Sequence, residues 1–177
     1  MLVKAPIGRA ARLRGVTLLE LLIVVTILAL LLGIALPSAQ DLIERNRLKA
    51  AAHALAEDLQ WTRSEAIKRN RVLGFSVDTE HWCYGVTDRP TGCDCRLTPD
   101  SEEACRIKRV LGETFPGTRI TSTLSLTRFE PRRATAINGS LTLSSPSGAE
   151  IRVVLSRLGR VRFCTPNAGL PGYDACG

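Results

Sequence analysis

Residues 16–36 read VTLLELLIVVTILALLLGIAL, and this apolar stretch decides how the rest of the chain is interpreted. As a helix it would extend about 31 Å, which matches the hydrocarbon thickness of a bilayer. Its one ionisable side chain, Glu20, is costly to place in lipid unless another group pairs with it. We therefore predict a transmembrane helix over 16–37 in which Glu20 has a functional role.

A short basic segment, 1–15, precedes the apolar stretch. It contains Lys4, Arg9, Arg12 and Arg14 and no acidic residue. Basic flanks stay on the cytoplasmic side of a membrane, so the residues after the span are predicted to lie outside the cytoplasm. Because no A-x-A-like cleavage site follows the stretch, an ordinary secretory signal peptide is the weaker interpretation.

The junction of the two segments, Gly15-Val16-Thr17-Leu18-Leu19-Glu20, resembles the prepilin cleavage motif of type IV pilins and type II secretion pseudopilins. The resemblance implies that 1–15 is a leader peptide, which prepilin peptidase removes after Gly15 before methylating Val16. Glu20 would then pair with the terminal ammonium of a neighbouring subunit during assembly. The implied location is the bacterial inner membrane, with the C-terminal part in the periplasm, and later a pilus fibre at the cell surface.

A second helical pattern follows Pro37. One stripe at three- and four-residue spacing contains Leu48, Ala52, Leu55, Leu59, Thr62 and Ala66. We predict that 38–71 is the amphipathic half of the same long helix, with this stripe against a sheet and His53 on a solvated face. The run 59–71, LQWTRSEAIKRNR, resembles the helix end of the GspH/FimT family of minor pilins and pseudopilins.

The remaining residues, 72–177, are predicted to form a globular β domain. Short β-prone runs occur at 72–77, 82–87, 119–129, 140–144, 151–156 and 160–164. Turns are predicted at Ser145-Pro146-Ser147-Gly148 and at Asn138-Gly139. A long helix on a mostly antiparallel sheet gives the α+β class, and the family resemblance makes the expected fold pilin-like.

All six cysteines follow the apolar stretch: Cys83, Cys93, Cys95, Cys105, Cys164 and Cys176. An even number on the outer side of a membrane predicts disulfides. The last two are placed to staple the C-terminal tail and the first four to staple a loop at about 88–105, although six cysteines allow fifteen pairings. No metal site is expected, since there is no C-x-x-C and the histidines are His53 and His81 alone.

Charge is segregated within the β domain, while the whole chain carries a formal +7. Residues 78–105 contain seven acidic side chains and two arginines, whereas 119–162 contain eight arginines and two glutamates. Arginine binds phosphate through a bidentate fork, so the second segment is a candidate polyanion surface. The alternative is a solvated sheet face.

The basic segment ends in Arg157-Leu158-Gly159-Arg160-Val161-Arg162-Phe163. In a strand, Arg160 and Arg162 would project to one side about 6.6 Å apart, close to two phosphate steps of DNA. Gly159 would allow a sharp turn and a close approach of a nucleic-acid backbone. Arg152 and Arg157 would extend the patch if their strand pairs alongside.

Gly159-Arg160-Val161-Arg162 resembles the G-R-x-R motif of FimT-type minor pilins, which bind DNA during natural transformation. The resemblance implies a minor type IV pilin in which Arg160 and Arg162 contact double-stranded DNA, weakly and without sequence preference. No aromatic platform is evident beside the arginines in the sequence, so single strands are the less expected ligand. The alternative is a structural pseudopilin of type II secretion that contacts other pseudopilins. No enzyme and no cofactor are predicted, because no set of catalytic residues occurs.

Overall fold

The structure is a computed structural model that describes residues 16–133, 135–167 and 170–177, and within 34–38 it describes the backbone only. The predicted leader peptide, including Gly15, lies outside the described residues. The chain divides into two units, Met1–Ala39 and Gln40–Gly177, which are described separately.

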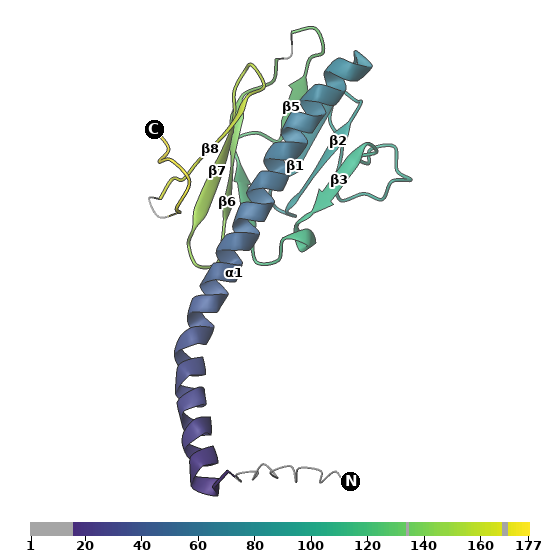
Figure 1. The fold of residues 1–177 in the computed structure, drawn as a ribbon. Coiled ribbons are helices and arrows are strands. Elements are labelled where there is room, and N and C mark those ends of the chain that lie inside the picture. Colours follow the sequence, from purple (N-terminus) through teal and green to yellow (C-terminus); the bar gives the residue numbers. More distant parts are fainter. Residues whose placement is uncertain (1–15, 134, 168–169) are drawn as a thin grey trace, which may run out of the picture. The chain divides into compact units, whose positions relative to one another are not determined.

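Helix α1, Leu18–Arg69, contains both halves of the predicted helix (Figure 1). It begins where Thr17 Oγ1 accepts a hydrogen bond of 3.2 Å from the Glu20 N–H, as an N-cap does. The large apolar side chains from Leu18 to Leu32 are exposed. Among the residues that the structure describes, no helix is both long and apolar enough to cross a membrane. The span predicted over 16–37 includes side chains at 34–37 that lie outside the described part, and it stays a prediction.

The predicted apolar stripe of α1 is confirmed in the second unit. Each of its members is 0% exposed: Leu48, Ala52, Leu55, Leu59, Thr62 and Ala66. The buried Thr62 hydroxyl is satisfied by donating to the Asp58 carbonyl at 2.6 Å. The helix ends at Arg69 because Asn70 adopts a φ of 49°, which lets the Arg71 N–H donate to the Ala66 carbonyl at 3.1 Å.

Two antiparallel four-stranded sheets pack against this half of α1, with strand orders β3-β2-β1-β5 and β4-β6-β7-β8. The first contains β1 (Leu73–Asp78), β2 (Cys83–Thr87), β3 (Lys108–Leu111) and β5 (Leu126–Phe129). The second contains β4 (Arg119–Ser122), β6 (Gly139–Ser144), β7 (Glu150–Leu155) and β8 (Val161–Cys164). A short 3-10 helix, η1 (Gly112–Thr114), follows β3.

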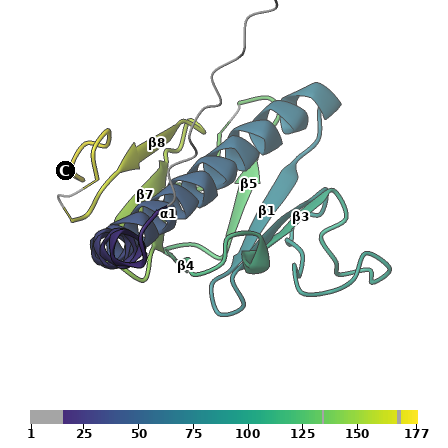
Figure 2. The ribbon, with the colours of Figure 1, turned by 60° about the horizontal axis from the view of Figure 1, so that its bottom comes forward.

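The helix crosses over both sheets, with β8 to one side of it and β3 to the other (Figures 1 and 2). One cluster of buried side chains joins the three layers and includes Leu55 of α1, Phe75 of β1 and Ile151 of β7. The predicted α+β fold, a long helix on antiparallel sheet, is therefore confirmed. Because the core is shared, the sheet edges are held in fixed positions relative to the helix.

The single strand predicted over 119–129 is wrong. The segment forms β4 and β5, which belong to different sheets. Ile120 is the buried residue of β4, whereas Thr127 and Phe129 are buried in β5, so the inward positions change from even to odd numbers between the strands. Ser122 supports the break by donating to the Leu124 carbonyl at 2.5 Å. Strand β3 was not predicted, because all four of its residues are half-buried and show no alternation.

The turn predicted at Asn138-Gly139 is also wrong. Gly139 is the first residue of β6 and pairs with Leu155 of β7. A Cβ atom at this position would lie 2.0 Å from Leu124 Cδ2, so the glycine provides space for a neighbouring side chain. The turn predicted at 145–148 is confirmed, since Gly148 has a φ of 82° and its N–H donates to the Ser145 carbonyl at 3.0 Å.

The six cysteines form three disulfides: Cys83–Cys95, Cys93–Cys105 and Cys164–Cys176. The first joins the 88–105 loop to β2, the second cross-links that loop internally, and the third holds the C-terminal tail to β8. The cross-linked loop and the cross-linked tail were both predicted from the sequence. The structure adds which cysteines pair, which the sequence left open.

Candidate nucleic-acid interface

The hairpin of β7 and β8 carries the arginines singled out in the sequence. Val154 lies opposite Arg162 and Arg152 lies opposite Cys164. The intervening residues of β7, Ile151, Val153 and Leu155, are buried. Because strand side chains alternate, Arg152 and Arg162 belong to the outward face of the sheet. Arg162 is exposed and Arg152 is half-buried.

The turn between the two strands needs Gly159, as predicted. Gly159 adopts a φ of 68°, and its N–H donates to the Ser156 carbonyl at 2.9 Å. The Ser156 N–H donates in return to the Arg160 carbonyl at 2.9 Å, and the Arg160 N–H donates to Ser156 Oγ at 3.1 Å. This closed turn leaves the side chains of Arg157 and Arg160 exposed.

The hairpin therefore brings together all five predicted DNA-binding residues: Arg152, Arg157, Gly159, Arg160 and Arg162. Arg160 lies one residue before β8, so strand alternation begins at Val161 and does not fix its direction. Arg152 donates from Nε to Thr142 Oγ1 at 3.1 Å. Over the described part of the chain, no carboxylate is within ion-pair distance of Arg157, Arg160 or Arg162. Their role in DNA binding stays a prediction.

The other arginines of the basic segment do not join this hairpin. Arg128 lies on β5 of the first sheet, and Arg119 lies on β4, the opposite edge of the second sheet from β8. Arg132 and Arg133 are exposed in the turn that follows β5, and this segment borders the hairpin, since the Ala136 N–H donates to the Arg157 carbonyl at 2.9 Å. The positive charge of 119–162 is therefore spread over several surfaces. The hairpin carries more of these arginines than any of the others.

The C-terminal tail packs beside the same hairpin and was not recognised from sequence. Thr165 N–H donates to the Asp174 carbonyl at 2.8 Å, and Cys176 N–H donates to the Thr165 carbonyl at 3.0 Å. These bonds bring Tyr173 to His53 of α1, with 2.9 Å between Tyr173 Oη and His53 Nε2. His53, expected to be solvated, is exposed but has this tail residue as its partner.

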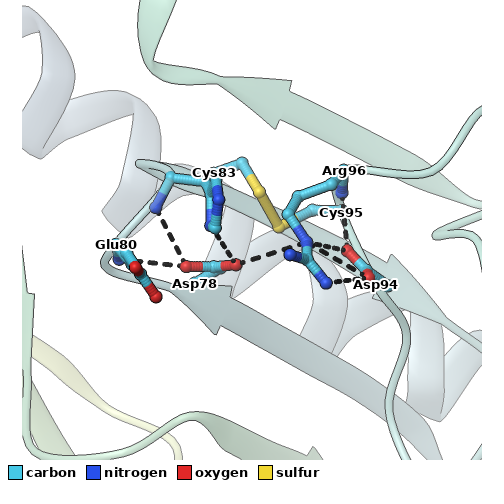
Figure 3. Close-up of polar contacts among 7 residues, drawn as sticks. Asp78, Glu80, Cys83, Asp94, Cys95 and Arg96 are labelled. Atoms are coloured by element: carbon cyan, nitrogen blue, oxygen red, sulfur yellow. Dashed lines mark hydrogen bonds and ion pairs between the residues drawn. A yellow bond between two sulfur atoms is a disulfide. The ribbon is translucent and has the colours of Figure 1, made fainter.

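Two carboxylates of the acidic segment 78–105, Asp78 and Asp94, are held by Arg96 and by backbone donors (Figure 3). Arg96 forms an ion pair with Asp94 at 2.7 Å and approaches Asp78 at 3.6 Å. Hydrogen bonds from Arg96 hold the pKa of Asp94 below its usual value. The His81 backbone N–H, which donates to Asp78 Oδ1 at 3.0 Å, is the main cause that lowers the pKa of Asp78. The loop is a cross-linked structural unit.

Within the described residues, no group of histidine, cysteine and carboxylate side chains could hold a metal ion. Within 78–105, Asp78 and Asp94 contact Arg96, and the four cysteines are paired in disulfides. The candidate recognition surface is the arginine hairpin together with the adjoining tail.

Comparisons with known proteins match this fold and its N-terminal segment. Residues 51–159 match the family described as type II transport protein GspH, and residues 11–36 match the prokaryotic N-terminal methylation motif. Over 165 residues the chain is 35% identical to the pilin-like protein PilA1 of Thermus thermophilus, which covers 85% of this chain and 97% of that protein.

Two further proteins come from type II secretion systems. The chain is 36% identical over 99 residues to type II secretion system protein H of Xanthomonas campestris pv. campestris, covering 53% of this chain and 58% of that protein. The minor pseudopilin EpsH from the type 2 secretion system of Vibrio cholerae has a similar fold, with a TM-score of 0.50 at 15% identity. That likeness covers 68% of this chain and 98% of EpsH.

Proposed function

The chain belongs to the GspH family of pilins and pseudopilins, and from that premise we propose that it is a minor type IV pilin whose periplasmic domain binds DNA for uptake in natural transformation. The observation that supports DNA binding is the β7–β8 hairpin. It presents Arg157, Arg160 and Arg162 at the surface without a carboxylate partner among the described residues. Guanidinium groups so arranged bind phosphates of the DNA backbone.

The expected interaction is weak and independent of base sequence. Phosphate contacts carry no sequence information, and few arginines are available on one subunit. Several subunits in a fibre would bind one DNA molecule together, which raises the overall affinity without new contacts. The partner proposed for this surface is double-stranded DNA.

The N-terminal segment supports the assembly part of the proposal. The methylation motif covers 11–36 and so includes Gly15, Val16 and Glu20. Prepilin peptidase would cleave after Gly15 and methylate Val16. The apolar helix would then anchor the protein in the inner membrane, with the C-terminal domain in the periplasm, until other pilins incorporate it into a fibre. Glu20 would pair with the terminal ammonium of its neighbour, offsetting the cost of both charges in lipid.

The DNA-binding proposal is tested with the full chain purified in neutral detergent. Duplex DNA is titrated at low and moderate salt against the wild type, the Arg160→Ala/Arg162→Ala variant and the Arg106→Ala/Arg119→Ala variant. The last variant is a matched control, because it removes the same charge from two exposed arginines, one before β3 and one on β4 at the far edge of the second sheet. Circular dichroism verifies that each protein is folded.

We expect the wild type and the control to bind duplex DNA similarly and the hairpin variant to lose most binding. Equal weakening of both variants would mean that any surface charge suffices and that the hairpin is not the site. Absence of binding by the wild type at low salt would reject the DNA proposal altogether.

A structural pseudopilin of type II secretion is the second candidate. The similarity to the secretion protein of Xanthomonas campestris pv. campestris supports it. In that role the domain would contact other pseudopilins in a periplasmic filament. Site-specific cross-linking from Arg160 in cells would then capture pseudopilins, whereas the first proposal expects DNA at this position.

A further inference from the structure

The C-terminal tail borders an open surface hollow of about 670 Å³ next to the arginine hairpin. Lys49 and His53 of α1, Arg162 and Phe163 of β8, and Tyr173 and Asp174 of the tail line it. Arg162 belongs to the outward face of the sheet and also borders this hollow. The sequence does not suggest the site, because His53 in its α1 wall lies 120 residues from Tyr173 in the tail.

The hollow combines cationic side chains with aromatic rings. Lys49 Nζ lies 5.9 Å from the centroid of the Tyr173 ring. Tyr173 and Phe163 meet edge to face with centroids 6.0 Å apart, and His53 lies 4.8 Å from Phe163. Phe163 and Tyr173 are only half-buried, so part of each ring borders the open space. Positive groups beside partly open aromatic rings are the combination that binds single-stranded nucleic acid.

We propose that this hollow holds an unpaired nucleotide of a DNA strand, with the phosphate between Lys49 and Arg162 and the base against Tyr173. The proposal rests on the proposed DNA-binding function and adds single-strand binding to it. In a duplex the bases are paired and stacked, so they do not reach a ring that lies beside an edge strand. A single strand or a frayed duplex end does.

The tail is held in the geometry that this contact requires. Cys164–Cys176 joins it to β8, and its backbone bonds to Thr165 fix the residues on either side of Ala175. The hydrogen bond between His53 and Tyr173 holds the ring over α1. Because these restraints exist before a ligand arrives, binding does not bear the entropy cost of ordering the tail.

Asp174 also lines the hollow, and its negative charge predicts the direction in which a substitution there should change the affinity for DNA. Its carboxylate repels a phosphate held by Lys49 and Arg162. Asp174→Asn removes that repulsion and keeps the backbone carbonyl that bonds Thr165. We expect about a twofold to threefold gain in affinity for single strands.

The main test uses the full chain in detergent with oligothymidine and with duplex DNA of equal length. Tyr173→Leu removes the aromatic ring, whereas Tyr173→Phe keeps the ring and removes only the hydroxyl that contacts His53. We expect Tyr173→Leu to lower single-strand affinity about fivefold or more and to leave duplex affinity unchanged. Tyr173→Phe should keep most single-strand affinity.

A lysine pair tests the cationic wall in the same assay. Lys49→Ala should weaken single-strand binding, while Lys68→Ala, an exposed lysine about 28 Å further along the same helix, should not. Equal effects of the two variants would attribute the loss to net charge and would overturn the role of Lys49.

Failure of this proposal is distinguishable from failure of the DNA proposal. If Arg160→Ala/Arg162→Ala abolishes duplex binding but Tyr173→Leu and Asp174→Asn leave single-strand binding unchanged, the hollow is not a nucleotide site and the hairpin proposal stands. If the wild type binds neither form of DNA, both proposals fail. Should Tyr173→Leu disturb the tail, the Asp174→Asn result decides alone.

Discussion

Tyr84 Oη donates a hydrogen bond of 3.0 Å to Asp58 Oδ2 and thereby ties β2 to the buried side of α1. Asp58 is 6% exposed and also accepts a hydrogen bond from Lys108 Nζ of β3. A carboxylate in such a position is costly unless it is paired. Burial, followed by the charge of Asp58, raises the pKa of Tyr84, so its hydroxyl remains a donor at physiological pH.

This pair leads to a first prediction for stability. Lys108→Met leaves the Asp58 carboxylate with a single neutral donor, and we expect it to lower the free energy of unfolding by about 1–3 kcal/mol. Tyr84→Phe removes the neutral donor and should cost about 1 kcal/mol. Urea denaturation measures both.

Lys68→Met is the control, because that side chain is 79% exposed and its contact with Glu65 is a long one of 4.0 Å. It should stay within about 0.5 kcal/mol of the wild type. A Lys108→Met protein as stable as this control would show that the Asp58 carboxylate does not depend on the lysine.

The same contact shows what the sequence could not predict. Asp58 and Lys108 are 50 residues apart, and His53 and Tyr173 are 120 apart. Local periodicity predicted the stripe of α1 and the β7–β8 hairpin, because spacing and turn chemistry determine them. Pairing between distant segments depends on strand order and on the disulfides, which no local pattern specifies.

The missed features have physical reasons of the same kind. A strand such as β3, half-buried throughout, has no alternation to detect. Gly139 follows an asparagine, as many turn glycines do, but in the structure it leaves space for the Leu124 side chain. Phe163 is adjacent to Arg162 in sequence, yet it becomes part of an aromatic cluster only when the tail supplies Tyr173.

Asp78 gives a prediction for pH. Its hydrogen bonds to the Glu80 and His81 N–H groups, at 2.9 and 3.0 Å, favour the charged carboxylate. Because these contacts lower the folded pKa beneath the unfolded one, the unfolded chain binds the proton more tightly. The stabilisation is therefore complete above about pH 4 and is lost as the pH falls through the folded pKa.

Asp78→Asn should accordingly be less stable at neutral pH by about 1 kcal/mol and lose less stability on acidification. Urea midpoints at several pH values between neutral and acid test this. Asp100→Asn, which changes an exposed aspartate of the 88–105 loop, serves as the reference and should follow the wild type. Parallel acid curves for wild type and Asp78→Asn would contradict the assignment.

The disulfides should differ in their effect even though each closes a separation of 12 residues. Cys83 and Cys95 are buried in a small cluster with Cys105, whereas Cys164 and Cys176 are half-buried beside the tail. We expect Cys83→Ser/Cys95→Ser to cost about 3 kcal/mol, through loop entropy and buried hydroxyls.

Cys164→Ser/Cys176→Ser should instead cost about 1 kcal/mol and loosen the tail locally. Thermal unfolding ranks the two variants, and limited proteolysis followed by mass spectrometry locates the cleavage. Early cleavage within 165–177, with the rest of the domain intact, is the expected pattern for the second variant. The reverse ranking of the melting temperatures would show that the tail, and not the 88–105 loop, stabilises the domain.

Salt dependence gives the last prediction and measures how many phosphates the hairpin contacts. Each phosphate neutralised by a protein cation releases counterions, so the logarithm of the duplex binding constant falls linearly with the logarithm of salt concentration. If Arg160 and Arg162 each contact one phosphate, Arg160→Ala/Arg162→Ala should make that slope shallower by about 1.8. Binding titrations across a salt series measure the slope for each variant. Arg152→Ala should change it less, because Arg152 is half-buried and its Nε is already bonded to Thr142. A double variant that binds more weakly with an unchanged slope would mean that the arginines shape the turn and do not contact phosphate.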